Sequence, residues 1–212
     1  MTIDDFKKLF ESGHPVVLDG AVGTNMMKAG MPMGVCPEKW MADNPGPIGE
    51  LQHGYMEAGS QIVLAPTFAA NAIKLKEYGL EDQVLYINKT LAENTRKATE
   101  GKCIIAGDMT MTGQQLAPLG DLDFEELVDV YKQQAKALLE GGVDIFFIET
   151  MMSLQETRAA LIAVKETAPD VPAMTSLTYN EDGKTLYGSA PAEAIVVLQS
   201  LGADAVGLNC ST

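Results

Sequence analysis

The sequence has few cysteines and no hydrophobic run long enough to cross a membrane. Only three cysteines occur in 212 residues, Cys36, Cys103 and Cys210. Their odd number and wide spacing argue against a framework of disulfide bonds. No apolar stretch approaches the ~20 residues of a membrane-spanning helix, and the N-terminus lacks the basic and apolar segments of a secretory signal. We therefore expect a cytosolic protein.

Positive charge is also scarce. Lys and Arg together number 15 against 29 Asp and Glu, which gives a net charge of −14. Such a surface repels nucleic-acid phosphates and anionic lipids, so we expect neither as a partner. Hydrophobic residues make up 46% of the chain, which excludes disorder as its dominant state. Residues 1–212 are enough for one large domain.

Several motifs of known chemistry are missing. The sequence contains no CxxC or HExxH pattern and no Walker A loop, and the glycines of segment 19–24 (DGAVGT) do not follow the GxGxxG spacing. The two histidines, His14 and His53, lie away from the expected strand ends, which favours surface or structural roles.

Short apolar runs recur along the chain, each with glycine or proline one or two residues before it and ending near a polar residue. They cover residues 15–19, 61–67, 102–108, 143–149, 171–177 and 203–210. Continuous apolarity is typical of strands buried on both faces, as in a parallel sheet.

Helical patterns separate these runs. Residues 81–99, 123–140 and 153–167 carry apolar side chains three and four positions apart, which predicts amphipathic helices. Ser153 with Glu156, and Asp123 with Glu126, resemble capping boxes at two of their starts. Three strands follow similar joints that contain glycine, residues 58–61, 141–144 and 201–204. The Pro- and Gly-rich residues 31–49 are expected to form a long loop.

Alternating strands and helices predict an α/β protein with a parallel sheet. A doubly wound sheet is one solution, but its usual phosphate loop is missing. A (β/α)8 TIM barrel is favoured because its site residues lie at the C-terminal ends of several strands. Polar residues stand at these ends here: Asp19, Thr67, Asp108, Glu149, Ser176 and Asn209. About six of the eight βα units can be counted.

Three of these positions have both a structural and a functional interpretation. Cys210 is either a small buried hydrophobic residue or a metal ligand or nucleophile at the barrel mouth. Glu149 either points into the mouth or forms a salt bridge or cap near the next helix. Asp19 is either a turn residue or a ligand contact beside Gly20, which allows close approach of a backbone.

Five segments together resemble the homocysteine S-methyltransferase domain family, the zinc-dependent barrels of methionine synthases and betaine–homocysteine methyltransferases. They are residues 18–24 (LDGAVGT), 65–71 (APTFAAN), 107–121 (GDMTMTGQQLAPLGD), 147–151 (FIETM) and 207–211 (GLNCS). Each segment alone is a weak signal, but all five in this order are specific. The third segment is most similar to the N-terminal domain of cobalamin-dependent methionine synthases.

The resemblance implies a zinc ion held by three cysteines, one after the sixth strand and an adjacent pair after the eighth. Cys210 matches the first, and the pair has no counterpart before Thr212. It further implies that Glu149 binds the amino group of homocysteine. Asp19 and the backbone of Gly20 would contact the same amino acid, with Thr67 and Asn209 near the zinc and thiol.

We therefore expect transfer of a methyl group to the thiol of homocysteine, giving methionine. A thiol has a pKa near ~8.5, and zinc deprotonates it to the nucleophilic thiolate. No general acid is required of the protein. The resemblance favours methylcobalamin as donor, with cobalamin- and folate-binding domains of the same parent chain as partners and cobalamin not bound by this domain alone.

Two alternatives stay open. The donor could be S-methylmethionine or betaine. A chain with one zinc ligand and six barrel units could instead be inactive alone, a partial barrel that only folds or self-associates through its open edges. An aldolase-type barrel is disfavoured, because no strand end carries the lysine that a Schiff base needs.

Overall fold

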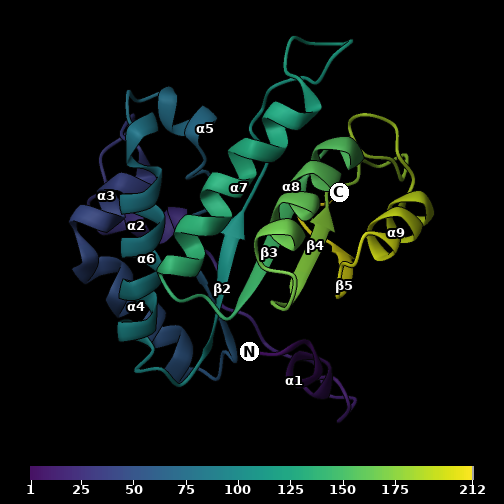
Figure 1. Cartoon of the computed structure of the whole chain (residues 1–212). Coiled ribbons are helices and arrows are strands. Elements are labelled where there is room, and N and C mark those ends of the chain that lie inside the picture. Colours follow the sequence, from purple (N-terminus) through teal and green to yellow (C-terminus); the bar gives the residue numbers. More distant parts are fainter. Residues whose placement is uncertain (212) are drawn as a thin grey trace.

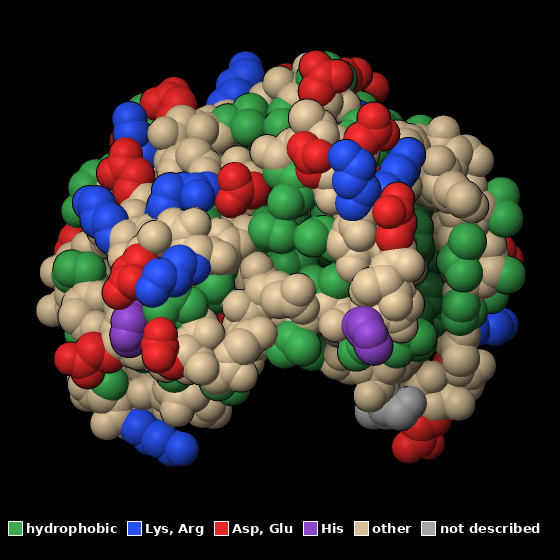
Figure 2. Space-filling view, turned by 90° about the horizontal axis from the view of Figure 1, so that it is seen from below, with side chains coloured by type: hydrophobic (Ala, Val, Ile, Leu, Met, Phe, Trp, Pro, Cys, Tyr) green, Lys and Arg blue, Asp and Glu red, His purple; other side chains and the backbone are tan. Residues whose placement is uncertain are grey.

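A curved parallel sheet with helices on its outer face forms the centre of the computed structural model, which describes residues 1–211 (Figure 1). Its strands pair in chain order: β1 (Ile62–Ala65), β2 (Ile104–Met109), β3 (Ile145–Met151), β4 (Ala173–Leu177) and β5 (Ala205–Leu208). Viewed from below, the molecule is an arch with a gap on one side (Figure 2). The expected α/β barrel architecture is confirmed, in the form of a partial barrel.

Helices connect the strands and cover the outside of the sheet. They are α1 (Ile3–Lys8), α2 (Gly23–Lys28), α3 (Pro37–Asp43), α4 (Pro45–Glu57), α5 (Ala72–Lys76), the 3-10 turn η1 (Glu81–Gln83), α6 (Val84–Ala98), α7 (Phe124–Glu140), α8 (Leu154–Thr167) and α9 (Pro191–Ser200). The helices expected at 81–99, 123–140 and 153–167 are confirmed. Among residues 1–211, no helix is both long and apolar enough to cross a membrane.

The prediction of a long loop at residues 31–49 is wrong. Most of this segment belongs to α3 and to the start of α4. Pro37 and Pro45 stand in the first turns of these helices, where the missing N–H of proline has no intrahelical partner to lose. Prolines that suggested a loop therefore begin helices.

The strand expected at residues 15–19 is also wrong, because only Leu18 forms a β-bridge, to Ile62. On both sides of this bridge, a side-chain oxygen accepts a hydrogen bond from a backbone N–H, where a regular strand pair would use a backbone carbonyl. The Gln61 side chain accepts from the N–H of Val17 at 3.2 Å, and the Asp19 carboxylate accepts from the N–H of Leu64 at 3.1 Å. The segment still lies beside β1 in the position of a first barrel strand.

The three similar joints share one hydrogen-bonding device. At the fourth position of each joint, a side chain accepts from a backbone N–H of the preceding strand segment. The pairs are Gln61 with Val17, Asp144 with Ile105, and Asp204 with Ala173. Arg96 and Lys165 add ion pairs of 2.8 Å to the two aspartates. The repeated sequence thus sets the register between neighbouring strands.

Side chains alternate between the inside and the outside of the sheet. Outward residues of β1 to β4 pack under the helices. Close packing explains Gly107, where a Cβ would lie 3.0 Å from the Leu138 side chain of α7. Inward residues near the strand starts form a separate cluster: Ile62, Ala106, Ile145 and Met174, together with Phe6 of α1. Helix α1 therefore closes the lower end of the barrel in Figure 1.

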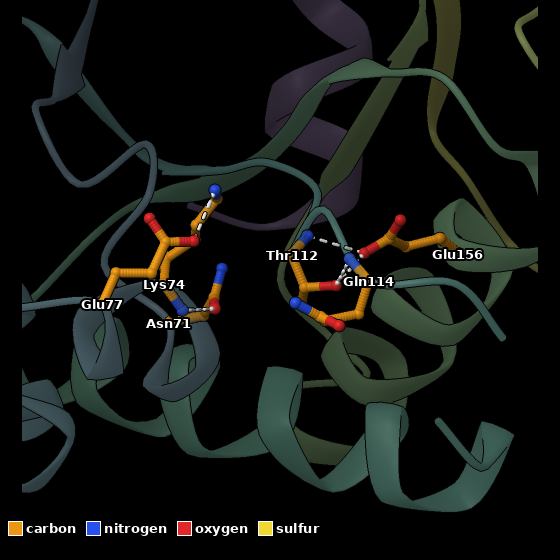
Figure 3. Close-up of polar contacts among 6 residues, drawn as sticks. All are labelled: Asn71, Lys74, Glu77, Thr112, Gln114 and Glu156. Atoms are coloured by element: carbon orange, nitrogen blue, oxygen red, sulfur yellow. Dashed lines mark hydrogen bonds and ion pairs between the residues drawn. The ribbon is translucent and has the colours of Figure 1, made fainter. Parts of the chain in front are cut away.

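Capping explains the starts of α7 and α8 only in part. Ser153 accepts from the N–H of Glu156 as expected, whereas Asp123 accepts from Glu125. The Glu156 carboxylate does not complete a capping box. It accepts from the N–H and the hydroxyl of Thr112, both at 2.7 Å, and so holds the loop that follows β2 (Figure 3).

Candidate functional site

A cavity of about 720 Å³ opens at the C-terminal ends of the strands. Carboxyl groups from four parts of the chain line it, namely Asp19, Glu38, Asp108 and Glu149, and the thiol of Cys210 stands at the same cavity. None of its described lining residues is Lys, Arg or His. The cavity therefore combines concentrated acidity with one thiol and an otherwise largely apolar wall.

A β-bulge turns Glu149 into this cavity. The pairing of β3 with β4 shifts register between Ile148 and Met151, and Thr150 has a left-handed φ of 56°. This conformation is strained for a β-branched residue, and such strain is typical of functional positions. Asn209 stabilises the bulge by accepting from the N–H of Thr150 at 3.1 Å.

Asn209 also fixes the Glu149 carboxylate. Its amide Nδ2 donates to Glu149 Oε2 at 2.5 Å, and its Oδ1 accepts from the Ser176 hydroxyl at 2.8 Å. The side chain thereby links the ends of β3, β4 and β5. Burial raises the pKa of Glu149 above its ordinary value, and hydrogen bonds with Asp108, Thr150 and Asn209 oppose this shift.

Cys210 follows Asn209 directly and has a left-handed φ of 47°. Its side chain is exposed at the cavity, in contrast to Cys36 and Cys103, which are buried. The interpretation of Cys210 as a buried hydrophobic residue is therefore wrong. The thiol lies 3.8 Å from the Thr150 hydroxyl and is open to a ligand or an ion.

Asp19 and Gly20 line the same cavity. The bond from the N–H of Leu64 gives Asp19 a structural task, yet the side chain still faces the cavity. Burial raises the pKa of Asp19 to about 7, against the opposing effect of this hydrogen bond. Gly20 is required by Tyr55, whose hydroxyl would lie 2.9 Å from a Cβ at this position.

Thr67 does not line the cavity. Its side chain is fully buried, and its hydroxyl donates to the carbonyl oxygen of Asp108 at 2.8 Å. The neighbouring Pro66 and Phe68 face the cavity in its place. Thr67 thus joins the ends of β1 and β2.

Two cavity carboxyls were not selected from the sequence as site residues. Asp108 stood among the polar strand ends, and its position alone could have identified it. Glu38 lies on α3, in the segment expected to be a loop, and no pattern indicated it. Its carboxylate accepts from the N–H of Ala69 at 2.9 Å and from the Cys36 thiol at 3.5 Å.

Only one of the cysteines that the structure describes, Cys210, lies at the cavity as a possible zinc ligand. The exposed Cys210 thiol has the right donor chemistry. The other two cysteines lie elsewhere: Cys36 contacts Glu38, and Cys103 donates to the carbonyl of Ser60. Within residues 1–211, no three His, Cys, Asp or Glu side chains are grouped to hold a metal ion. The described residues therefore do not form a complete zinc site.

Asp19→Asn should make stability less sensitive to pH. The ordinary Asp pKa is 3.8 and that of Asp19 is about 7, so between these values the folded state holds a proton that the unfolded chain has lost. Stability due to Asp19 therefore falls as pH rises from about 4 to 7. Asparagine keeps an acceptor for Leu64 and has no charge to bury.

The measurement is urea unfolding of both proteins at several pH values. The free energy of unfolding of the variant, relative to the unchanged protein, should rise by at least about 1.4 kcal/mol over this range, the equivalent of one pKa unit. The difference in free energy of unfolding between the two proteins should be constant above pH 8. Parallel pH curves would contradict the raised pKa of Asp19.

Comparison with known proteins shows the family of this chain. The model of the family "Homocysteine S-methyltransferase" matches residues 16–212. The chain belongs to this family. The resemblance inferred from the sequence is thereby confirmed.

Relatives within the family differ in length. The chain is 27% identical to a methionine synthase of Mycobacterium tuberculosis, over 95% of this chain and 18% of that protein. It is 29% identical to betaine–homocysteine S-methyltransferase 1 of Danio rerio, over 94% of this chain and 49% of that protein. The chain thus spans less than half the length of these relatives.

A solved structure of the family has the same fold. The homocysteine methyltransferase MmuM of Escherichia coli, in its metallated form, superimposes with a TM-score of 0.79 at 23% identity. The match covers 96% of this chain and 77% of that one. The partial barrel seen here therefore corresponds to most of a homocysteine methyltransferase barrel.

Proposed function

We propose that the cavity binds L-homocysteine and presents its thiol for methylation. The observation that carries this proposal is the pairing of four carboxyl groups with an exposed thiol in one cavity that has no basic lining side chain. An amino-acid thiol offers an ammonium group to the acids and a sulfur atom that can lie near Cys210. Glu149 would bind the ammonium group and Asp19 would contact the same amino acid, as the family resemblance implies.

Residues of the chain orient the substrate in this proposal. Asn209 holds Glu149, so the carboxylate is in place before the ligand arrives, and such preorganisation lowers the entropic cost of correct alignment. Gly20 lets the backbone approach the amino acid. The apolar wall, which includes Phe147 and Leu208, would contact the methylene groups.

The proposal also covers the metal ion and the methyl donor. Cys210 would be one zinc ligand, and bound zinc would supply a deprotonated, nucleophilic sulfur. With a single thiol ligand we expect no turnover by residues 1–212 alone. Methylcobalamin is the proposed donor on the strength of segment 107–121, with cobalamin- and folate-binding domains as partners. The cytosolic location stays a prediction from the cysteine pattern.

Calorimetric titration with L-homocysteine under reducing conditions tests this function. We expect binding to the unchanged chain, and tighter binding when Zn²⁺ is added. Cys210→Ser should abolish the effect of zinc, whereas the matched variant Cys103→Ser, which changes a buried thiol away from the cavity, should keep it. A zinc effect that survives Cys210→Ser would contradict the proposed ligand.

Lack of any homocysteine binding would overturn the whole proposal. The alternative of an inactive, self-associating partial barrel would then be favoured if the chain also sedimented as an oligomer. The structure offers a surface for this alternative, since Leu208 of the terminal strand β5 is 65% exposed.

A further inference from the structure

Thr110 is hydrogen-bonded to two segments that line the cavity, although it does not line the cavity itself. It directly follows β2 and is only 3% exposed. Its backbone N–H donates to the carbonyl of Phe68 at 3.0 Å, and its hydroxyl donates to the carbonyl of Glu149 at 2.8 Å. Phe68 follows β1 and Glu149 belongs to β3, and both line the cavity. One buried residue therefore holds the backbone of two cavity walls.

The bond to Glu149 holds one side of the peptide group that joins Glu149 to Thr150. In a trans peptide such as this one, the carbonyl of the first residue and the N–H of the second point in opposite directions. The carbonyl of Glu149 accepts from Thr110, and the N–H of Thr150 donates to Oδ1 of Asn209 at 3.1 Å. Side chains that follow β2 and β5 thus clamp this peptide group from both sides.

The clamp gives a reason for the persistence of the bulge. Thr150 has a left-handed φ of 56°, and a strained conformation of this kind persists only where the surrounding contacts over-determine it. Without the Thr110 hydroxyl, the carbonyl of Glu149 would lose this donor, and a buried carbonyl without a partner is unfavourable. The bulge would then be held from the Asn209 side alone.

The carbonyl oxygen of Thr110 is also engaged. Tyr131 of α7 is fully buried, and its hydroxyl lies 3.1 Å from this oxygen and 3.0 Å from Oε1 of Glu156. The N–H, carbonyl and hydroxyl of Thr110 therefore all have partners. This arrangement holds the hydroxyl in one orientation, towards Glu149.

We propose that Thr110 is a positioning residue of the binding site, which acts through the Glu149–Thr150 peptide group to keep the Glu149 side chain turned into the cavity. Thr110 itself makes no contact with the ligand. The inference rests on the proposed function, because it takes homocysteine as the ligand. It adds a residue that lies outside the cavity.

Replacements of nearly equal shape test this role. Thr110→Val removes the hydroxyl, Thr110→Ser restores it, and Thr110→Ala is a second replacement without it. Thr157→Val is the matched control, since Thr157 is a fully buried threonine of α8 whose hydroxyl also donates to a backbone carbonyl, that of Ser153 at 2.7 Å. Thermal unfolding, calorimetric titration with L-homocysteine and NMR hydrogen exchange of the Thr150 amide are measured for each chain.

Thr110→Val should lower the affinity for L-homocysteine at least about five-fold, which is within the range for one lost hydrogen bond. The amide of Thr150 should exchange at least about five-fold faster, because its peptide group opens more readily when it is held from one side. Thr110→Ser should restore both values to within about two-fold. Thr157→Val should change neither value, although it removes a hydrogen bond of the same kind.

A double-mutant cycle tests whether Thr110 acts through Glu149. In the Glu149→Gln background, Thr110→Val should cause a further loss of affinity of less than about two-fold, because the carboxylate that Thr110 positions is already gone. Additive losses would show that Thr110 affects binding by another route, and the inference would be wrong.

Two further results would overturn the inference while leaving the proposed function intact. One is an unchanged homocysteine affinity or an unchanged Thr150 exchange rate in both Thr110→Val and Thr110→Ala. The other is an equal loss of affinity in the control Thr157→Val, which would indicate a general effect of lost stability. Failure of the unchanged chain to bind L-homocysteine at all would overturn both the inference and the proposed function.

Discussion

Glu149→Gln should lower the affinity for L-homocysteine about 100-fold, a loss that corresponds to about 2.7 kcal/mol. The replacement keeps the size and shape of the side chain but removes the negative charge that would face the ligand's ammonium group. Because Asn209 holds the carboxylate in place, the unchanged protein need not reorganise on binding, and the full electrostatic contribution is lost in the variant.

Titration calorimetry measures this effect, and Glu193→Gln is the matched control. Glu193 is an exposed carboxylate of α9 that accepts from the N–H of Ala190, away from the cavity. The control should bind as the unchanged protein does. Glu149→Gln should also unfold at the same urea concentration or a higher one, since burial raises the pKa of Glu149 and disfavours its charge. An affinity within about three-fold of the unchanged protein would exclude Glu149 as the principal ammonium ligand.

Phe6→Ala should destabilise the fold by about 3–5 kcal/mol, the range for removing a buried aromatic side chain. Phe6 is 1% exposed and packs in the lower barrel cluster with Ile62, Ala106 and Ile145. Its loss would leave a cavity among inward side chains of three strands, because the rigid sheet cannot collapse around it.

Urea unfolding of Phe6→Ala and Phe10→Ala isolates this contribution. Phe10 touches Phe6 edge-to-face, with ring centroids 5.2 Å apart, but it is 46% exposed. Its replacement should cost about 1 kcal/mol or less. If the two variants lost equal stability, α1 would not close the barrel as described.

Much of the architecture could be predicted from local patterns. The continuous apolar runs from 61–67 onward became β1 to β5, and the amphipathic segment at 81–99 became η1 and α6. These predictions succeeded because strand burial and helix amphipathicity are written into consecutive residues. Segment 15–19 has a similar apolar run, but the prediction of a strand failed there. Side chains of Gln61 and Asp19 accept the hydrogen bonds that backbone carbonyls would accept in a longer strand pair.

The candidate site was predictable to a similar extent. Polar residues at strand ends identified Asp19, Glu149, Asn209 and Cys210, and all four line one cavity. Thr67 had the same strand-end position, yet its hydroxyl is used by a backbone carbonyl. Position after a strand predicts which end of the barrel a residue occupies, but not whether its side chain faces inward.

Local sequence patterns are enough to specify the alternation of strands and helices, the parallel sheet, and the acidic residues at its C-terminal edge. These features depend on residue order and periodicity alone. Which acids meet, and how their protonation is shifted, depends on the folded arrangement. The bulge at Thr150 turns Glu149 inward, Asn209 fixes it from another strand, and burial leaves Asp108 with an unpaired oxygen. Each of these depends on contacts between residues distant in the chain, and no local pattern contains them.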